Sequence, residues 1–216
     1  NAMTRTTQGD GIGNNNGYST VGLLLGTPLD RSISSGFFFM DLRGHIENNG
    51  NIAYNLGGGW RMIDWGASDK GVYGIHAGFD GRRYECQAAR TCKEITFNWF
   101  NLGLERLGDR FDVRGNAYFN AGKKRREYGL TAVGFEGNDL LVARNYAEAF
   151  WGFDGEVGGR FALGSDGGFK AYAALGGYHF DSYHGKYATG GRARLEIEPV
   201  SFVSLGVNGS IDSRFD

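Results

Sequence analysis

Polar and apolar residues alternate along residues 110–120, RFDVRGNAYFN. The small or apolar positions are Phe111, Val113, Gly115, Ala117 and Phe119. A period of two is typical of a β-strand whose two faces meet different surroundings. The stretch therefore predicts a strand with one apolar and one polar face. It leaves open which face is turned inward.

The same alternation recurs along most of the chain and predicts about ten strands, most near the roughly 9–11 residues that cross an outer membrane. The expected strands are 18–28, 35–46, 51–62, 71–80, 94–106, 110–120, 150–162, 168–180, 189–198 and 201–211. Between them, 126–147 predicts a less regular hairpin that turns at Gly137-Asn138-Asp139. A short helix at 139–150 is the alternative for that segment.

The connections between the expected strands differ in length from one end of the strands to the other. Tight connections are LGDR (107–110), GSDGG (164–168) and EP (198–199), and long ones are 80–94, 121–147 and 181–190. Bacterial outer-membrane barrels have short periplasmic turns and long external loops. ENNG (47–50) is short on the long side, and 29–34 is moderately long on the short side.

Composition supports a chain of many strands and tight turns. Aromatic residues make up 14%, with 38 Gly and 2 Pro, which argues against disorder. The net charge of −1 gives no reason to expect a strong attraction to nucleic acid or to anionic lipid. No apolar run approaches the roughly 20 residues of a membrane helix, but alternating barrel strands do not produce such runs.

The polar face decides between two architectures. Its charged members, of mixed sign, are Asp112, Arg114, Asp154, Glu156, Arg160, Arg192, Arg194, Glu196 and Glu198. A barrel of ten or more strands is too wide for apolar side chains to fill, so these residues are expected to face a polar lumen. We therefore expect an all-β, antiparallel, up-and-down barrel of about 10–12 strands, of the transmembrane type. In a soluble sandwich or closed barrel the same charges would face water instead.

Residues 1–17 are expected to be a flexible lead-in, and NAM at its start is typical of an expression scar. Residues 18–216 are expected to be a single barrel domain, trimmed at one or both ends. Cys86 and Cys92 lie in one loop-like stretch and predict a disulfide on the external side. Two free thiols are the alternative.

The order of these segments resembles the β-domain of the inverse autotransporters, the intimin/invasin group of outer-membrane adhesins. The segments that carry the resemblance are STVGLLLGTPLD (19–30), 37–63, GVYGIHAGFDGRR (71–83), 100–119, GFDGEVGGRFA (152–162) and 195–212. Each is weak alone, and their shared order carries the weight. The chain departs from the family at 19–30, where Gly-Thr-Pro-Leu-Asp stands for Leu-Pro-Phe-x-Asp, and the first and last of the family's twelve strands have no clear equivalent.

The resemblance implies a monomeric, non-enzymatic anchor in the bacterial outer membrane. Its partners would be outer-membrane lipid and a C-terminal passenger of its own that passes through the pore. A general porin-like channel, or a soluble surface or periplasmic β-protein that binds a ligand, are the alternatives.

Candidate chemistry is sparse. The four His are His45, His76, His179 and His184, without His-Glu-x-x-His spacing. No Gly-x-Ser-x-Gly elbow is present. Asp154 and Glu156 share a strand face and could act as paired carboxylates, but ion pairs in a lumen account for them better. We expect no catalytic residue, no metal site and no cofactor.

Overall fold

The structure of the chain is a computed structural model that describes residues 2–7, 17–27, 36–64, 71–84, 94–136, 139–163, 169–200 and 203–213. Within these ranges the chain forms strands joined by turns, without a helix, and the strands pair antiparallel. The strands are β1 (Ala2–Thr7), β2 (Tyr18–Gly26), β3 (Gly36–Glu47), β4 (Ile52–Asp64), β5 (Gly71–Tyr84), β6 (Ile95–Gly108), β7 (Phe111–Asn120), β8 (Arg125–Glu136), β9 (Asp139–Glu148), β10 (Phe150–Leu163), β11 (Phe169–Ser182), β12 (Tyr187–Val200) and β13 (Val203–Asp212).

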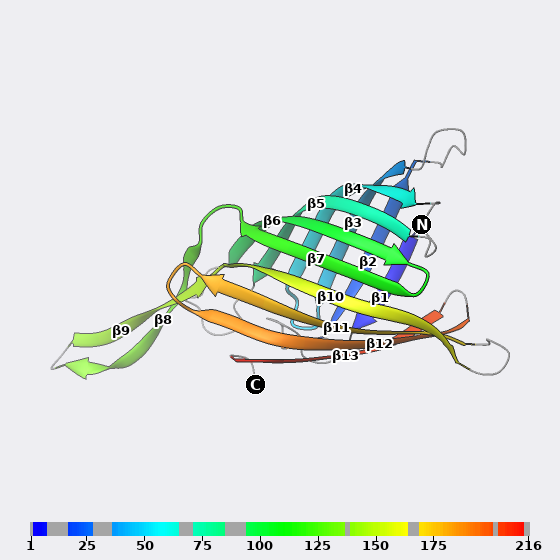
Figure 1. Ribbon diagram of the computed structural model, residues 1–216. Coiled ribbons are helices and arrows are strands. Elements are labelled where there is room, and N and C mark those ends of the chain that lie inside the picture. Colours follow the sequence, from blue (N-terminus) through cyan, green and yellow to red (C-terminus); the bar gives the residue numbers. More distant parts are fainter. Residues whose placement is uncertain are drawn as a thin grey trace.

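Eleven of the strands form one sheet in the order β1-β2-β3-β4-β5-β6-β7-β10-β11-β12-β13. Strands that follow one another pair side by side, except that β7 pairs with β10. The sheet curls into a half-barrel, and the β8–β9 hairpin projects from it as a separate two-stranded ribbon (Figure 1). The expected up-and-down antiparallel order is therefore present, in a sheet that is open along β1 and β13 in the described part of the chain.

All ten strands expected from the alternation are present, with bounds that differ by a few residues at their ends. The expected long connection 181–190 is wrong, because β11 and β12 extend into it and leave only residues 183–186 between them. The 126–147 hairpin is also confirmed, and β9 replaces the alternative helix. The expectation of no strand in 1–17 is wrong, because β1 pairs with β2 from Ala2↔Leu23 to Thr7↔Tyr18. Backbone hydrogen bonds to a neighbouring strand hold this polar segment, and its side-chain pattern carries no sign of them.

The two faces of the sheet differ sharply. Side chains of the polar set reach one another across intervening strands, so the polar face is the concave one. It holds buried Asp112, Asp154 and Glu156. The convex face exposes large apolar side chains on every strand from β2 to β7 and on β10 to β13, with Leu175 72% and Val207 73% exposed. Apolar residues are thus outside and charges inside, the reverse of a soluble sheet.

A small apolar cluster lies at one end of the concave face, where the β8–β9 hairpin leaves and rejoins the sheet. Buried Ile95, Phe97 and Ala149 form its centre, and Tyr84 and Trp99 pack against it. The indole Nε1 of Trp99 donates to the carbonyl of Phe150, at 2.7 Å. These contacts fix the place at which the chain returns from the hairpin to β10.

Candidate functional site

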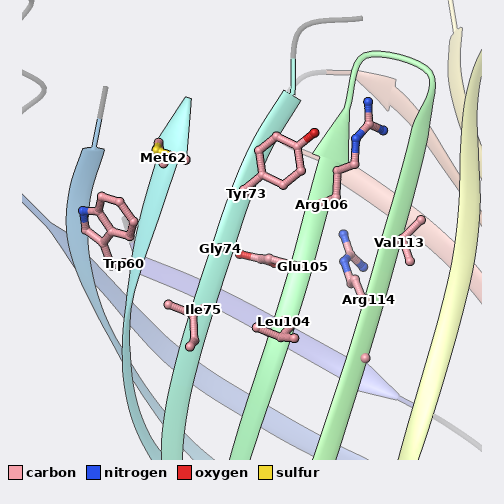
Figure 2. A pocket seen from close by; sticks show the side chains of 11 residues that line it. Trp60, Met62, Tyr73, Gly74, Ile75, Leu104, Glu105, Arg106, Val113 and Arg114 are labelled. Atoms are coloured by element: carbon pink, nitrogen blue, oxygen red, sulfur yellow. The ribbon is translucent and has the colours of Figure 1, made fainter. Parts of the chain in front are cut away.

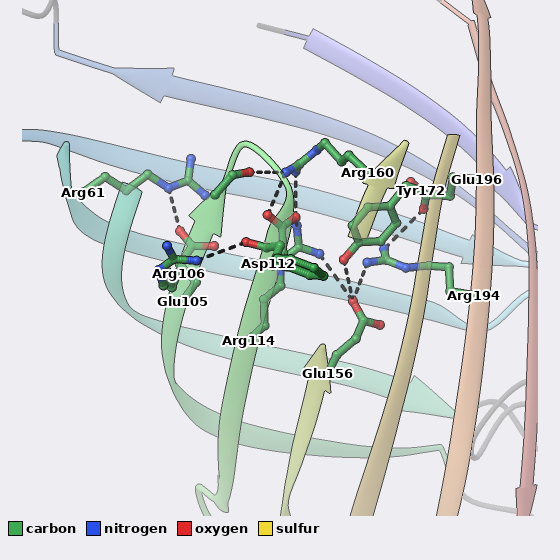
Figure 3. Close-up of polar contacts among 12 residues, drawn as sticks. Arg61, Glu105, Arg106, Asp112, Arg114, Glu156, Arg160, Tyr172, Arg194 and Glu196 are labelled. Carbon is green, nitrogen blue, oxygen red and sulfur yellow. Dashed lines mark hydrogen bonds and ion pairs between the residues drawn. The ribbon is translucent and has the colours of Figure 1, made fainter. Parts of the chain in front are cut away.

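The concave face of the half-barrel carries the polar side chains that the sequence singles out. A curved sheet brings side chains on its inner face together, so residues two strands apart come into contact. Arg194 of β12 reaches Glu156 of β10 across β11, at 2.5 Å (Figure 3). Arg192 reaches Asp154 in the same way, at 3.0 Å. The site is therefore a lining built by many strands.

Asp112 is the centre of the first ion-pair group. Its side chain is 1% exposed, and Arg160 binds both of its oxygens, at 2.7 and 2.6 Å. Arg160 also donates to the carbonyl of Gly108, at 2.7 Å, which ties β10 to the end of β6. Arg114, two residues along β7, donates to Asp112 at 3.3 Å. A bidentate arginine and a second cation are the partners that a buried carboxylate needs.

Glu156 is the centre of the second group and contacts three arginines. Arg194 lies at 2.5 Å, and Arg114 and Arg192 each lie at 3.6 Å. Tyr172 lies among them, and the guanidinium carbons of Arg114, Arg160 and Arg194 are 6.0, 5.6 and 5.0 Å from its ring centre. An aromatic face close to guanidinium groups adds a cation–π contribution to such a cluster.

A row of side-chain hydrogen bonds continues the lining across the other half of the sheet. It runs from Thr20 to His45 at 2.8 Å, to Asn55 at 2.5 Å, to Asp80 at 2.5 Å and to Asn101 at 2.6 Å. Each residue belongs to the next strand, from β2 to β6.

The row meets the ion-pair groups at Asp154. Asn101 lies opposite Tyr118 in the β6–β7 register, and the Tyr118 hydroxyl donates to Asp154 at 2.7 Å. Asp154 also accepts from Asn116 and from Arg192, each at 3.0 Å. The concave face thus carries a polar belt from β2 to β12.

All nine charged residues expected on the polar face share the concave side of β7, β10 and β12. The structure brings eight of them into ion pairs, since Arg194 also reaches Glu196 at 3.2 Å. Glu198 is exposed near the end of β12, opposite Lys170. Cys86 and Cys92 lie outside the described residues, so their disulfide stays a prediction.

The nine charged residues predicted from the sequence are only part of the polar belt. Thr20, Asn101, Tyr118 and Tyr172 belong to it although they are uncharged, and Arg61 belongs to it as the partner of Glu105, at 2.6 Å. Strand parity was the available signal, because Asn101, Tyr118, Tyr172 and Arg61 each alternate with apolar neighbours on their own strands.

Each carboxylate of the ion-pair groups accepts from at least one guanidinium, an arrangement that suits a wall better than an acid–base pair. The described residues contain no group of three His, Cys, Asp or Glu side chains that could hold a metal ion. His179 bonds to Thr189, and His184 lies by Glu148, so the two do not form one site. The described residues contain no helix that is long and apolar enough to cross a membrane.

Comparison of the sequence with protein-family models gives no match, and comparison with curated proteins gives none either. The geometry of the two faces of the sheet is therefore the main guide to function.

Proposed function

We propose that the half-barrel is the wall of an outer-membrane β-barrel, with its convex face against lipid and its concave polar belt around the lumen. The observation that carries this proposal is the inverted burial of the two faces. Exposed large apolar side chains far outnumber buried ones, while the most completely buried large side chain described is a carboxylate, Asp112. Soluble proteins rarely expose apolar patches above a few hundred Å².

The strand ends support the same orientation. The β6–β7 turn is formed by Asp109 and Arg110 alone, whereas the opposite end of the sheet carries the long β5–β6 connection and the β8–β9 hairpin beside the short β3–β4 and β11–β12 connections. Barrels of the outer membrane turn their short connections to the periplasm. We place the hairpin on the external side on this ground.

Strand direction sets a condition on closure. Ten successive antiparallel pairings separate β1 from β13, so these two edge strands run in the same direction. A closed barrel that is antiparallel throughout needs one further strand between them. Bacterial barrels of a single chain have even strand numbers, and one strand added to this sheet gives twelve.

Within this class we propose a non-enzymatic anchor and translocator of the inverse autotransporter type. The order of the sequence motifs supports it, and so does an edge that accepts a twelfth strand. Its lumen would pass a C-terminal passenger chain in extended form, and the polar belt would present side chains to that chain. The cell location that follows is the bacterial outer membrane.

Reconstitution tests the barrel directly. The chain is refolded into phospholipid vesicles, and its strands are probed by protease and by a shift in gel mobility on heating. We expect the described strands to be protected and the β8–β9 hairpin to be cut from one side. A chain that remains monomeric and folded in water without detergent would contradict the proposal.

Planar-bilayer conductance separates the translocator from a general porin. We expect a translocator at rest to conduct little. A large, steady, ohmic current from the intact chain would favour the porin-like alternative. Surface proteolysis of cells that express the native full-length protein then shows whether a passenger is exported.

A further inference from the structure

Two adjoining hollows lie on the convex face, over β3 to β7. The first has a volume of about 560 Å³ and is lined by side chains that include Trp60, Tyr73, Leu104 and Arg106 (Figure 2). The second, also about 560 Å³, shares Trp60 and Ile75 with the first. Together they form one track, which we call the convex track.

The register shows how the convex track is built. Tyr73, Arg106 and Val113 are successive partners on β5, β6 and β7. Two residues farther from the turn lie Ile75 and Leu104, and two farther again lie Ala77 and Leu102. Ala77 pairs with Gly58 of β4, and these small residues leave room between their larger neighbours.

Arg106 stands at the head of this track. It lies two residues before Gly108, the last residue of β6, and so close to the short β6–β7 turn. Its Nη1 donates to the carbonyl of Phe111 at 3.4 Å, and its guanidinium carbon is 5.9 Å from the ring centre of Tyr73. A cation at this depth can reach the polar boundary of a bilayer while its stem stays on apolar surface.

We propose that the convex track binds one anionic phospholipid, with its phosphate on Arg106 and an acyl chain along Ile75, Ala77 and Leu102. This inference rests on the proposed function. A guanidinium has five N–H donors, and it can bind a phosphate through two parallel hydrogen bonds while keeping a contact such as that to Phe111. Tyr73 and Trp60 are residue types that favour the membrane interface.

The arrangement favours a lipid over a free anion, because the cation heads an apolar track that only an amphiphile would fill. It favours a phospholipid over lipopolysaccharide because the track begins at the short-turn end. That end faces the periplasm in barrels of this class, and the leaflet on that side is built of phospholipid.

Native mass spectrometry of the full chain in non-ionic detergent tests the site, with phosphatidylglycerol as the probe. Arg106→Gln removes the bidentate phosphate contact, and we expect bound phosphatidylglycerol to fall more than about tenfold, the effect of losing two charge-assisted hydrogen bonds. Ala77→Trp fills the track and should reduce binding with Arg106 intact. Arg110→Gln removes a charge from the adjacent turn and should leave binding unchanged.

Three outcomes would contradict the proposed lipid site. They are no phosphatidylglycerol bound to the unsubstituted chain, equal binding by the unsubstituted chain and Arg106→Gln, and displacement of the lipid by lipopolysaccharide or inorganic phosphate at equal concentration. Vesicle insertion of the same variants is measured in parallel. Failure of the full-length native protein to insert would reject the barrel itself. Insertion with unaltered lipid binding by Arg106→Gln would reject the lipid site alone.

Discussion

Arg61 of β4 and Glu105 of β6 form an ion pair, with Arg61 Nε 2.6 Å from a carboxylate oxygen of Glu105, across a strand that lies between them. The residue of β5 between them in the register is Gly74. Tyr178 and Asp212 meet in the same way over Gly190, at 2.7 Å. Glycine on the middle strand thus lets side chains of its two neighbours meet on the concave face.

Gly74→Val should break the Arg61–Glu105 pair. A Cβ at Gly74 would lie 2.6 Å from Oε1 and 2.8 Å from Cγ of Glu105, so the Glu105 side chain must move. We expect a loss of about 1–3 kcal/mol in the free energy of unfolding, measured by urea titration of the refolded protein. Gly44→Val is the control, since nothing lies within 4 Å of its Cβ position, and it should cost less than about 0.5 kcal/mol. Equal losses would contradict this role for Gly74.

Asp112→Asn should destabilise the protein more than Arg160→Gln. Asp112 is buried and forms ion pairs with Arg114 and Arg160, so its replacement by Asn leaves both arginines without the negative charge of that carboxylate. We expect about 2–3 kcal/mol, below the 3–5 kcal/mol of a fully buried pair because Arg160 keeps much of its hydration. The double variant should cost less than the sum of the two single changes, and additive losses would show that the pair is not coupled.

Val207→Arg places a cation on the convex face at the middle of β13, where Val207 is 73% exposed. If that face meets lipid, we expect a cost of about 2–4 kcal/mol to folding in vesicles, the penalty for a cation near the bilayer midplane. Asn208→Arg places the same charge on the concave face of the same strand and should cost less than about 1 kcal/mol. In a soluble protein the two exposed positions would respond alike.

The Cys86–Cys92 disulfide should be present in protein prepared without reductant. Thiol titration after denaturation should find no free thiol before reduction and two after it. Because the loop is short, we expect reduction to lower the free energy of unfolding by roughly 2–3 kcal/mol at most. Two titratable thiols in the oxidised protein would show that this pairing is wrong.

Much of the sheet could be predicted from alternation alone. The β10 strand is easily predicted, because Trp151, Phe153 and Val157 alternate with Asp154 and Glu156. The same parity placed the charged residues of β7, β10 and β12 on one face. The β1 strand could not be found in this way, since its partner, not its own pattern, determines it.

Side-chain contacts between strands that are separated by one intervening strand also could not be predicted from the sequence. Curvature brings Arg194 to Glu156, and no local pattern encodes how strongly a sheet curves. Nor does alternation report that β7 pairs directly with β10 and leaves the β8–β9 hairpin outside the sheet. Both depend on which strands meet, and this is decided by packing over the whole sheet.

A single spin label tests most directly whether the convex face meets lipid. Leu175 lies in the middle of β11 and is 72% exposed on that face. We would place a nitroxide there as Leu175→Cys, in a chain whose Cys86 and Cys92 are Ser, and refold it in vesicles. The proposal predicts strong relaxation by oxygen, which concentrates in lipid, and weak relaxation by a water-soluble nickel chelate. Strong relaxation by the nickel chelate, or protection from both reagents, would contradict it.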